Sequence, residues 1–385
     1  MATQALLGAR IFDGEGWHDG AALLIEGAEV AGIVPATAVP RGAAVVRLAG
    51  GVLAPGFVDW QVNGGGGVLL NDAPTPATMQ RIADAHARFG TTALLPTLIS
   101  DRPAAVTAAI AAARIAVAAG QGVVGLHLEG PHLAPARKGT HLAAHLRPMT
   151  DADLAELCAA AAALPVLLLT VAPEQVSPAQ VAALTAAGAR VSLGHTDCDA
   201  ATARVWFDAG ARGVTHLFNA MSGLGHRAPG LVGAALDDGR VWGGIIADGA
   251  HVDAISLRIA LRAKRGPGRL MLVTDAMSLV GAAGDRLTLD GREIRRAVTG
   301  GVSRLTLTDG TLAGSDLDMA TALRFAVADL GIGLAEALRM ASRYPAQFLG
   351  LADRGHLGPG ARADLAHLDD ALQPRGVWRA GQRLL

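Results

Sequence analysis

Cysteine is scarce in this sequence, and its scarcity excludes one class of protein. The 385 residues contain only Cys158 and Cys198, which lie in unrelated contexts without CxxC spacing. This arrangement argues against a disulfide framework and is typical of proteins from a reducing compartment. A chain of this length needs no disulfide bonds to be stable, because only much shorter chains have difficulty in burying a hydrophobic core. We therefore expect a cytoplasmic protein.

Long apolar runs and basic clusters are missing as well. Hydrophobic residues make up 51% of the chain, but no apolar run reaches the roughly 20 residues that a membrane span requires. The N-terminal MATQALLGARIFDG lacks the basic segment followed by an apolar one that marks a signal peptide. The net charge of −1 gives no electrostatic footprint for nucleic acid. We expect no membrane or nucleic-acid partner, and any anionic ligand should be small.

The two ends of the chain differ in pattern from its middle. Residues 1–54 and 355–385 consist of short β-like segments separated by Gly, Asp and Pro. Between them, apolar strands alternate with alanine-rich helical stretches, a repeat that predicts a parallel sheet. We expect the two ends to meet in one discontinuous β-sandwich domain, and residues 55–354 to form a second domain.

The middle region contains eight candidate strands, the number that closes a (β/α)₈ barrel. They are GFVDWQVN, TTALLPTLI, GVVGLHLEG, PVLLLTVAPE, ARVSLGHT, GVTHLFNAM, WGGIIADG and RLMLVTDAM. Helical stretches lie between most of them. Residues 285–314 break the alternation and predict a hairpin insertion after the eighth strand, followed by helices over about 316–330 and 334–350.

Polar side chains recur where the predicted strands end. They are Gln61, Asn63, Glu129, His195, His216, Asp248 and Asp275. Each of them alone could be a hydrogen-bonded core group. Because a barrel places the carboxyl ends of its strands on one rim, where barrel enzymes carry their chemistry, together they predict a shared site.

Three of these residues form a plausible metal-binding set. Glu129, His195 and His216 supply one oxygen and two imidazole nitrogens, which suits zinc or another divalent ion that keeps a position open for water. Such an ion lowers the pKa of water from 15.7 to about 7. The alternative is three separately satisfied polar residues. His127 shares a strand face with Glu129, and we expect it to be structural, one layer deeper in the barrel.

Other residues suit proton transfer and carbonyl polarisation. Asp275, at the end of the eighth strand, is the best candidate for a general base; alternatively, it orients a ligand or caps a helix. His141 and Lys138 lie on the loop after the third strand. His141 could reach over the metal and polarise a carbonyl oxygen, or it could be a solvated loop histidine.

A further group suits substrate binding. Asn219 and Ala220 follow the sixth strand, Arg227 lies in GHRAPG, and Asp248 and His251 lie in ADGAH. Arg227 with a nearby imidazole could bind a phosphate through charge-assisted hydrogen bonds. The alternative for Arg227 is a surface arginine without a partner.

The chain resembles the amidohydrolase superfamily and, within it, the N-acetylglucosamine-6-phosphate deacetylases. The motifs that carry the resemblance cover nearly the whole chain in order: PGFVDWQVNGGGG, TTALLPTLIS, GLHLEGPHL with KGTH, VSLGHTD, THLFNAMS, IIADGAHVD, LVTDAM and LAGSDLDM. The resemblance implies hydrolysis of the acetamide of N-acetylglucosamine 6-phosphate to glucosamine 6-phosphate and acetate.

The resemblance also assigns roles. It implies one divalent ion per subunit on Glu129, His195 and His216, with zinc as the default and iron, cobalt or manganese as alternatives. It implies that Asp275 is the acid/base and that His141 helps to polarise the acetamide. It implies a homodimer in which Arg227 reaches into the neighbouring subunit's site. The residues assigned to the phosphorylated amino sugar are Asn219, Ala220, Arg227, Asp248, His251, Leu312, Ala313 and Gly314.

Two departures from the family pattern stand out. The first strand of the superfamily usually carries His-x-His, but here it carries Gln61 and Asn63, which are poor ligands for a transition metal; this predicts one ion instead of two. In HRAPG, Ala228 replaces an acidic residue, which leaves the details of that loop open.

The alternative substrates are N-acetylgalactosamine 6-phosphate or an unphosphorylated N-acyl compound. A catalytically silent sugar-phosphate sensor is a further alternative, against which the intact Asp275 argues.

Overall fold

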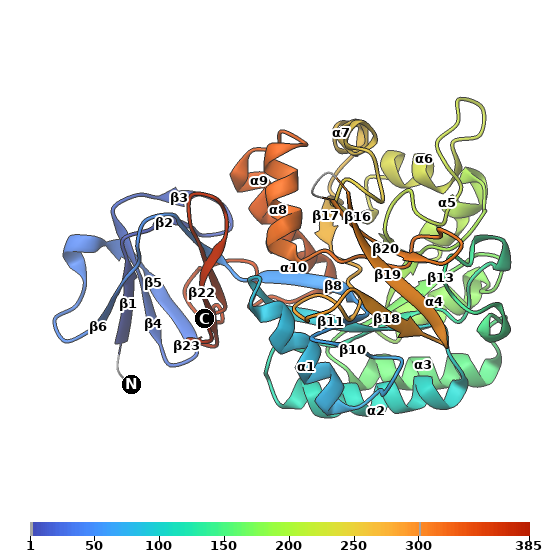
Figure 1. Ribbon diagram of the computed structural model, residues 1–385, viewed down its shortest axis with the longest axis horizontal. Coiled ribbons are helices and arrows are strands. Elements are labelled where there is room, and N and C mark those ends of the chain that lie inside the picture. The colour runs from blue at the N-terminus through green and yellow to red at the C-terminus, as the bar shows by residue number, and fades with distance from the viewer. Residues whose placement is uncertain (1–2, 300–301) are drawn as a thin grey trace.

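The computed structural model describes residues 3–299 and 302–385, and it has a small and a large lobe (Figure 1). Both ends of the chain lie in the small lobe, whereas the long middle of the chain forms the large lobe. Within the described residues, no helix is long and apolar enough to cross a membrane.

The small lobe is a sandwich of two sheets, with strand orders β5-β4-β1-β6 and β23-β22-β21-β7-β2-β3. Its core joins Leu6 and Leu23 of one sheet to Leu53, Leu365 and Trp378 of the other. Both ends of the chain therefore build one hydrophobic core, as predicted. The strands are β1 (Thr3–Leu7), β2 (Arg10–Phe12), β3 (Trp17–His18), β4 (Ala21–Glu26), β5 (Glu29–Pro35), β6 (Ala44–Arg47), β7 (Val52–Pro55), β21 (Leu365–Leu368), β22 (Pro374–Arg379) and β23 (Gln382–Arg383).

The large lobe is built on an eight-stranded parallel sheet that closes into a barrel. The strands are β8 (Phe57–Val62), β11 (Thr91–Ile99), β12 (Leu126–Glu129), β13 (Leu167–Val171), β14 (Arg190–Leu193), β15 (Gly213–Val214), β16 (Trp242–Ile246) and β17 (Leu270–Val273). Closure occurs just beyond β17, where the Asp275 N–H donates to the Gln61 carbonyl at 2.9 Å. A parallel bridge pairs Val62 with Ala276 at the same place. The eight predicted strands and the barrel fold are confirmed.

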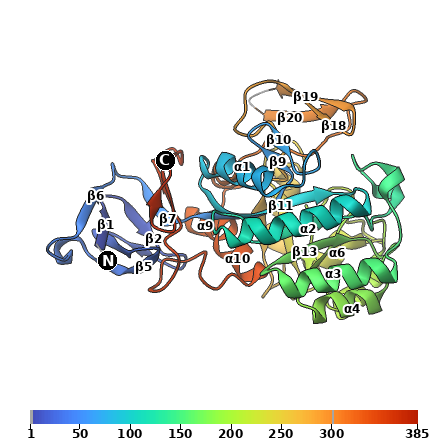
Figure 2. The same cartoon turned by 90° about the horizontal axis from the view of Figure 1, so that it is seen from below.

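Helices follow the strands and cover the outside of the barrel (Figure 2). Polar residues define where several of them begin: Thr150 and Ser177 form capping boxes at α3 and α4, and Asp199 caps α5. The helices are α1 (Pro76–Ala87), α2 (Pro103–Ala118), α3 (Asp151–Ala163), α4 (Pro178–Ala186), α5 (Ala200–Asp208), α6 (Gly230–Asp237), α7 (Ala254–Ala263), α8 (Met319–Ala328), α9 (Leu334–Ala341) and α10 (Arg343–Leu349).

The helix predicted over 334–350 is wrong as a single element. The structure breaks it into α9 and α10 at Ser342, whose φ and ψ are −132° and −67°. Pro345 explains the break, because a proline has no N–H and its ring clashes with the carbonyl four residues earlier. Proline is tolerated in a first helical turn, so a new helix begins at Arg343.

The insertion after the eighth strand is a three-stranded antiparallel sheet formed by β18 (Arg286–Leu289), β19 (Arg292–Thr299) and β20 (Val302–Leu307). Figure 2 shows this sheet beside β9 (Gly64–Gly65) and β10 (Val68–Leu69). An apolar cluster that includes Ile294 and Leu305 of the sheet with Ile99 and Met277 of the barrel rim holds it there. The predicted hairpin is confirmed for the described residues; residues 300–301 within it lie outside them.

Candidate active site

A cavity of about 380 Å³ opens at the carboxyl ends of the barrel strands. It gathers residues that are far apart in the sequence and that the motifs single out. Those among its lining residues are Asn63, Glu129, His141, His195, His216, Asn219, Ala220, His251, Asp275, Leu312 and Gly314. Of the seven polar residues predicted on the rim, five line this cavity, whereas Gln61 and Asp248 do not.

A carboxylate and two imidazoles converge at its base. Glu129 Oε1 lies 3.2 Å from His195 Nε2 and 3.0 Å from His216 Nε2. The two Nε2 atoms are 3.1 Å apart. All three side chains are buried. Donor atoms around a tetrahedral zinc ion lie roughly 3.4 Å from one another, so the spacing suits a shared cation.

The hydrogen bonding of His195 makes the case for a cation stronger. His195 Nδ1 lies 2.8 Å from the carbonyl oxygen of Arg137 and donates to it. A ring with its proton on Nδ1 presents a lone pair from Nε2, which here faces the lone pairs of the Glu129 carboxylate at 3.2 Å. Two acceptor atoms in contact repel each other unless a positive charge lies between them. Histidines that bind a metal through one ring nitrogen usually donate from the other to a carbonyl or carboxylate, as His195 Nδ1 does. The residues present therefore fit a divalent metal.

Charge and burial act against each other at Glu129. Burial raises the pKa of its carboxyl group, but the adjacent imidazoles of His195 and His216 outweigh burial and hold that pKa well below its usual range. Burial lowers the pKa of His216, but the Glu129 carboxylate outweighs it and raises that pKa. Glu129 therefore stays ionised although it is buried.

The backbone is strained where these residues sit. His195, His216 and Asp275 have φ values of 48°, 28° and 53°, in the left-handed region that side chains disfavour. Residues held in such conformations cluster at functional sites, where the surrounding structure enforces them. The strain therefore falls on three residues that the sequence motifs also single out. This indicates that the directions of their side chains matter for function.

Asp275 faces the cluster from the end of β17. Its Oδ1 accepts hydrogen bonds from Asn63 Nδ2 at 2.7 Å and from Gln61 Nε2 at 3.2 Å. Burial and the nearby Glu129 carboxylate raise the pKa of Asp275 to about 6. A general base works best when its pKa is near the working pH, so this carboxylate is suited to proton transfer.

Gln61 and Asn63 have a role that the sequence did not reveal. Gln61 Nε2 donates to Asp275 and also to Glu129 Oε1, at 3.1 Å. The first strand therefore supplies amide donors that tie the two carboxylates together. In the sequence they stood out as polar residues at a strand end and as replacements of the superfamily's His-x-His, but neither signal indicated these partners.

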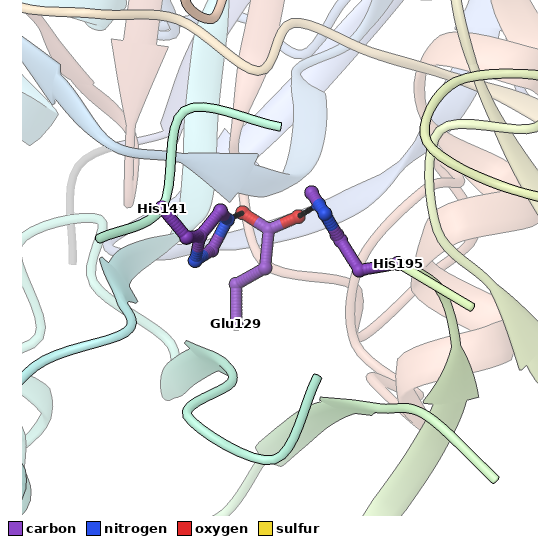
Figure 3. Close-up of side chains that lie close together, drawn as sticks. All are labelled: Glu129, His141 and His195. Atoms are coloured by element: carbon purple, nitrogen blue, oxygen red, sulfur yellow. Dashed lines mark hydrogen bonds and ion pairs between the residues drawn. The ribbon is translucent and has the colours of Figure 1, made fainter. Parts of the chain in front are cut away.

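His141 faces one carboxylate oxygen of Glu129 and His195 the other (Figure 3), and the centroids of the two imidazole rings are 4.5 Å apart. Its Nδ1 lies 2.8 Å from Ser100 Oγ and accepts from the Ser100 N–H at 3.3 Å. The neutral ring therefore has its proton on Nε2, which lies 4.0 Å from Glu129 Oε2. Burial lowers the pKa of His141 to about 3, so the ring is a neutral donor. Ser100 was not singled out in the sequence; its position directly after the second strand was the only signal.

His141 also belongs to a possible metal-binding group. Ligand atoms of Glu129, His141 and His195 all lie within 4.8 Å of one another, so these buried residues could hold a divalent metal. Coordination by His141 through Nε2 would require the proton on Nδ1, which would then donate to Ser100 Oγ at 2.8 Å and give up the contact with the Ser100 N–H at 3.3 Å. His216 Nε2 lies 3.0 Å from Glu129 Oε1, closer than the 4.0 Å between His141 Nε2 and Glu129 Oε2.

The residues assigned to substrate binding do not all reach the cavity. His251 lines it, whereas Asp248 lies behind and accepts from His251 Nδ1 at 2.7 Å. Asp248 thereby leaves His251 Nε2 free for a ligand. Ala313 is fully buried between two lining residues. Arg227 is exposed on the loop before α6, outside the lining residues of its own cavity.

His127 lies deeper in the barrel. Its Nδ1 is 3.1 Å from Thr97 Oγ1 and its Nε2 is 2.8 Å from Thr170 Oγ1. Burial lowers the pKa of His127 to about 4, so the ring is a neutral link between strands. This is the structural position expected from the sequence.

Comparisons with known proteins agree on the family of this chain. Residues 52–384 match the model of the amidohydrolase family. The chain is 45% identical to an N-acetylgalactosamine-6-phosphate deacetylase of Shewanella sp. (strain ANA-3), over 88% of this chain and 84% of that protein. It is 39% identical to an N-acetylglucosamine-6-phosphate deacetylase of Bos taurus, over 86% and 83% of the two chains.

A solved structure agrees with this. N-acetylglucosamine-6-phosphate deacetylase from Pasteurella multocida superposes with a TM-score of 0.94 at 31% identity, over 99% of each chain. The likeness thus includes the small lobe as well as the barrel. By the family model, by its relatives and by its fold, this chain belongs to the amidohydrolase family.

Proposed function

We propose that this protein hydrolyses the acetamide of N-acetylglucosamine 6-phosphate to glucosamine 6-phosphate and acetate. The observation that carries the proposal is the contact of Glu129 with His195 and His216, next to Asp275, in one rim cavity. We propose that these three ligands hold one divalent ion, with zinc as the default for two imidazoles and a carboxylate and iron, cobalt or manganese as alternatives.

Each residue of the site has its own role in the reaction. The bound cation supplies Lewis-acid chemistry, which polarises a carbonyl oxygen and lowers the pKa of water. Asp275 takes the proton from the attacking water and returns it to the amine that leaves. His141 donates from Nε2 to the acetamide oxygen as negative charge develops on it. Gln61 and Asn63 hold Asp275 by its Oδ1.

The phosphate needs hydrogen-bond donors, and we propose Arg227 and His251. His251 lines the cavity and is oriented by Asp248. The exposed position of Arg227 suits a role in the cavity of a second subunit. Apolar side chains support a homodimer through this side of the barrel: Ile255 and Ile259, four residues apart on α7, are 59% and 52% exposed, and Leu224 on the Arg227 loop is 53% exposed.

N-acetylgalactosamine 6-phosphate is the second candidate substrate. The 45% identity to a deacetylase of that name favours it. The two sugars differ only in the direction of one hydroxyl group at C4, so the acetamide and phosphate sites would serve both. Acetate release from both phosphates and from the two unphosphorylated sugars decides between them. No release from any of the four by metal-loaded protein would contradict the proposed function.

Arg227→Ala is expected to lower kcat/KM only for phosphorylated sugars. The expected loss is about 10- to 100-fold, because a hydrogen bond to a charged group contributes about 1.5–3 kcal/mol. Activity on an unphosphorylated N-acetyl sugar should stay unchanged. Arg204→Ala is the matched control, since Arg204 is an exposed arginine on α5 that pairs with Asp237 at 3.4 Å. An equal loss on both kinds of sugar would contradict phosphate binding by Arg227.

Metal removal is expected to lower the free energy of unfolding. A ligand that binds only the folded state stabilises it by about 2.7 kcal/mol at a free concentration 100 times its Kd. Chelated protein should therefore unfold at lower denaturant concentration than the same protein reloaded with zinc, as measured by circular dichroism. Identical unfolding curves for the two samples would argue against a site on Glu129, His195 and His216.

A further inference from the structure

The insertion sheet reaches the loop that carries His141. Arg292, the first residue of β19, donates from Nη2 to the carbonyl oxygen of Thr140 at 2.7 Å. Thr140 directly precedes His141, and both line the cavity. These two segments are 152 residues apart in the sequence. The contact therefore joins the loop after the third strand to an element that belongs to the eighth.

Arg292 is held firmly by its own sheet. It follows the turn Asp290-Gly291, whose φ values are 51° and 74°, and it pairs with Leu289 across the hairpin. Alternation along β19 places Arg292 on the same face as Ile294, which is fully buried. The Asp290 carboxylate lies 3.5 Å from Arg292 Nη2, the same nitrogen that donates to Thr140.

The same insertion is also joined to the general base. Leu312 and Gly314, which follow β20, line the cavity. The next residue, Ser315, donates its N–H to the Asp275 carbonyl at 2.9 Å. The insertion thus connects the Asp275 side of the cavity to the His141 side.

The His141 loop needs such a contact. Ser100 orients the imidazole ring, but Lys138 and Gly139, just before Thr140, are exposed to solvent. The guanidinium of Arg292 binds the backbone of this exposed stretch one residue before the ring. A displacement of 1 Å away from the reacting atoms can lower a rate by about 100-fold, so the position of this backbone matters.

We propose that Arg292 is a positioning residue, which holds the Thr140 carbonyl so that His141 Nε2 points at the acetamide oxygen. This inference rests on the proposed function. Arg292 touches neither the ligand set nor Asp275, so its effect should pass through His141 alone. A lysine at this position could donate to the same carbonyl, but its flexible ammonium group is less pre-organised than the planar guanidinium.

The kinetic test compares three variants on the phosphorylated sugar that wild type hydrolyses. Arg292→Ala should lower kcat by about 10- to 100-fold with unchanged KM and metal content, and Arg292→Lys should restore part of the loss. Arg295→Ala is the control, because Arg295 lies on the opposite, exposed face of β19 and pairs with Glu293. Wild-type kcat in Arg292→Ala would overturn the inference. An inactive wild type would instead contradict the proposed function.

Two further measurements separate positioning from a general structural role. In a His141→Ala background, Arg292→Ala should cause less than about a threefold further loss, since residues that act through one another are not additive. Trypsin should cleave after Lys138 at least several times faster in Arg292→Ala than in Arg295→Ala, as followed by mass spectrometry. Full additivity in the double variant, or equal cleavage rates, would overturn the proposal.

Discussion

Asp275→Asn is expected to keep its metal and to lose acetate release by about 10²–10⁴-fold, the usual contribution of general acid–base catalysis. The substitution is nearly isosteric and leaves a carbonyl oxygen that can accept from Asn63 and Gln61, as Oδ1 now does. It removes the basic oxygen that would take a proton from water. The fold and the metal ligands should be untouched, so the loss should appear in kcat.

The control for this variant is Asp199→Asn. Asp199 caps α5 by accepting from the Thr202 N–H at 2.7 Å, and asparagine caps helices about as well as aspartate. Its kcat and metal content should equal those of wild type. Wild-type turnover by Asp275→Asn would exclude Asp275 as the acid/base and would leave the raised pKa of its carboxyl group as a consequence of burial alone.

Glu129→Gln is expected to lose the metal itself. The Glu129 carboxylate is the only negatively charged member of the proposed ligand set. A neutral amide can replace its shape but not its charge. Loss of an outer partner of a metal ligand already weakens binding about 10- to 100-fold, so loss of the charged ligand should exceed 100-fold. Metal content after dialysis against a buffer of fixed free zinc measures this directly.

Glu174→Gln is the matched control for charge. Glu174 follows β13 and accepts from Thr196 Oγ1 at 2.7 Å and from the Asp197 N–H at 2.8 Å. It belongs to the rim but not to the group of possible ligands. The control should retain the wild-type metal content. A Glu129→Gln variant that binds zinc as wild type does would show that the ion lies elsewhere.

The two variants together separate the two roles. Full metal with little turnover in Asp275→Asn, and little metal in Glu129→Gln, is the pattern that the proposed assignment requires. The reverse pattern would mean that Asp275 is a ligand and that Glu129 is not. Because His141 also lies near Glu129, His141→Ala should keep its metal if His216 is the second imidazole ligand.

Local patterns in the sequence were sufficient for much of the fold. Strand and helix periods depend on neighbouring residues, so alternating apolar strands and alanine-rich helices predicted the eight barrel strands and the insertion. The position of Glu129, His195, His216 and Asp275 at strand ends follows from the same patterns, and a barrel brings such ends to one rim. One local feature was misjudged, because the effect of Pro345 on the preceding helix outweighs the periodicity of 334–350.

The partners of these residues were decided only by the tertiary structure. Gln61 meets Glu129 and Asp275 across 68 and 214 residues of sequence, and Ser100 meets His141 across 41. The left-handed backbone at His195 and at His216 has no marker in the sequence, since neither residue is a glycine. The sequence by itself determined which chemical groups are present and on which strands they lie. Closure of the barrel determined which of them touch, because hydrogen bonds of about 3 Å depend on how distant strands meet.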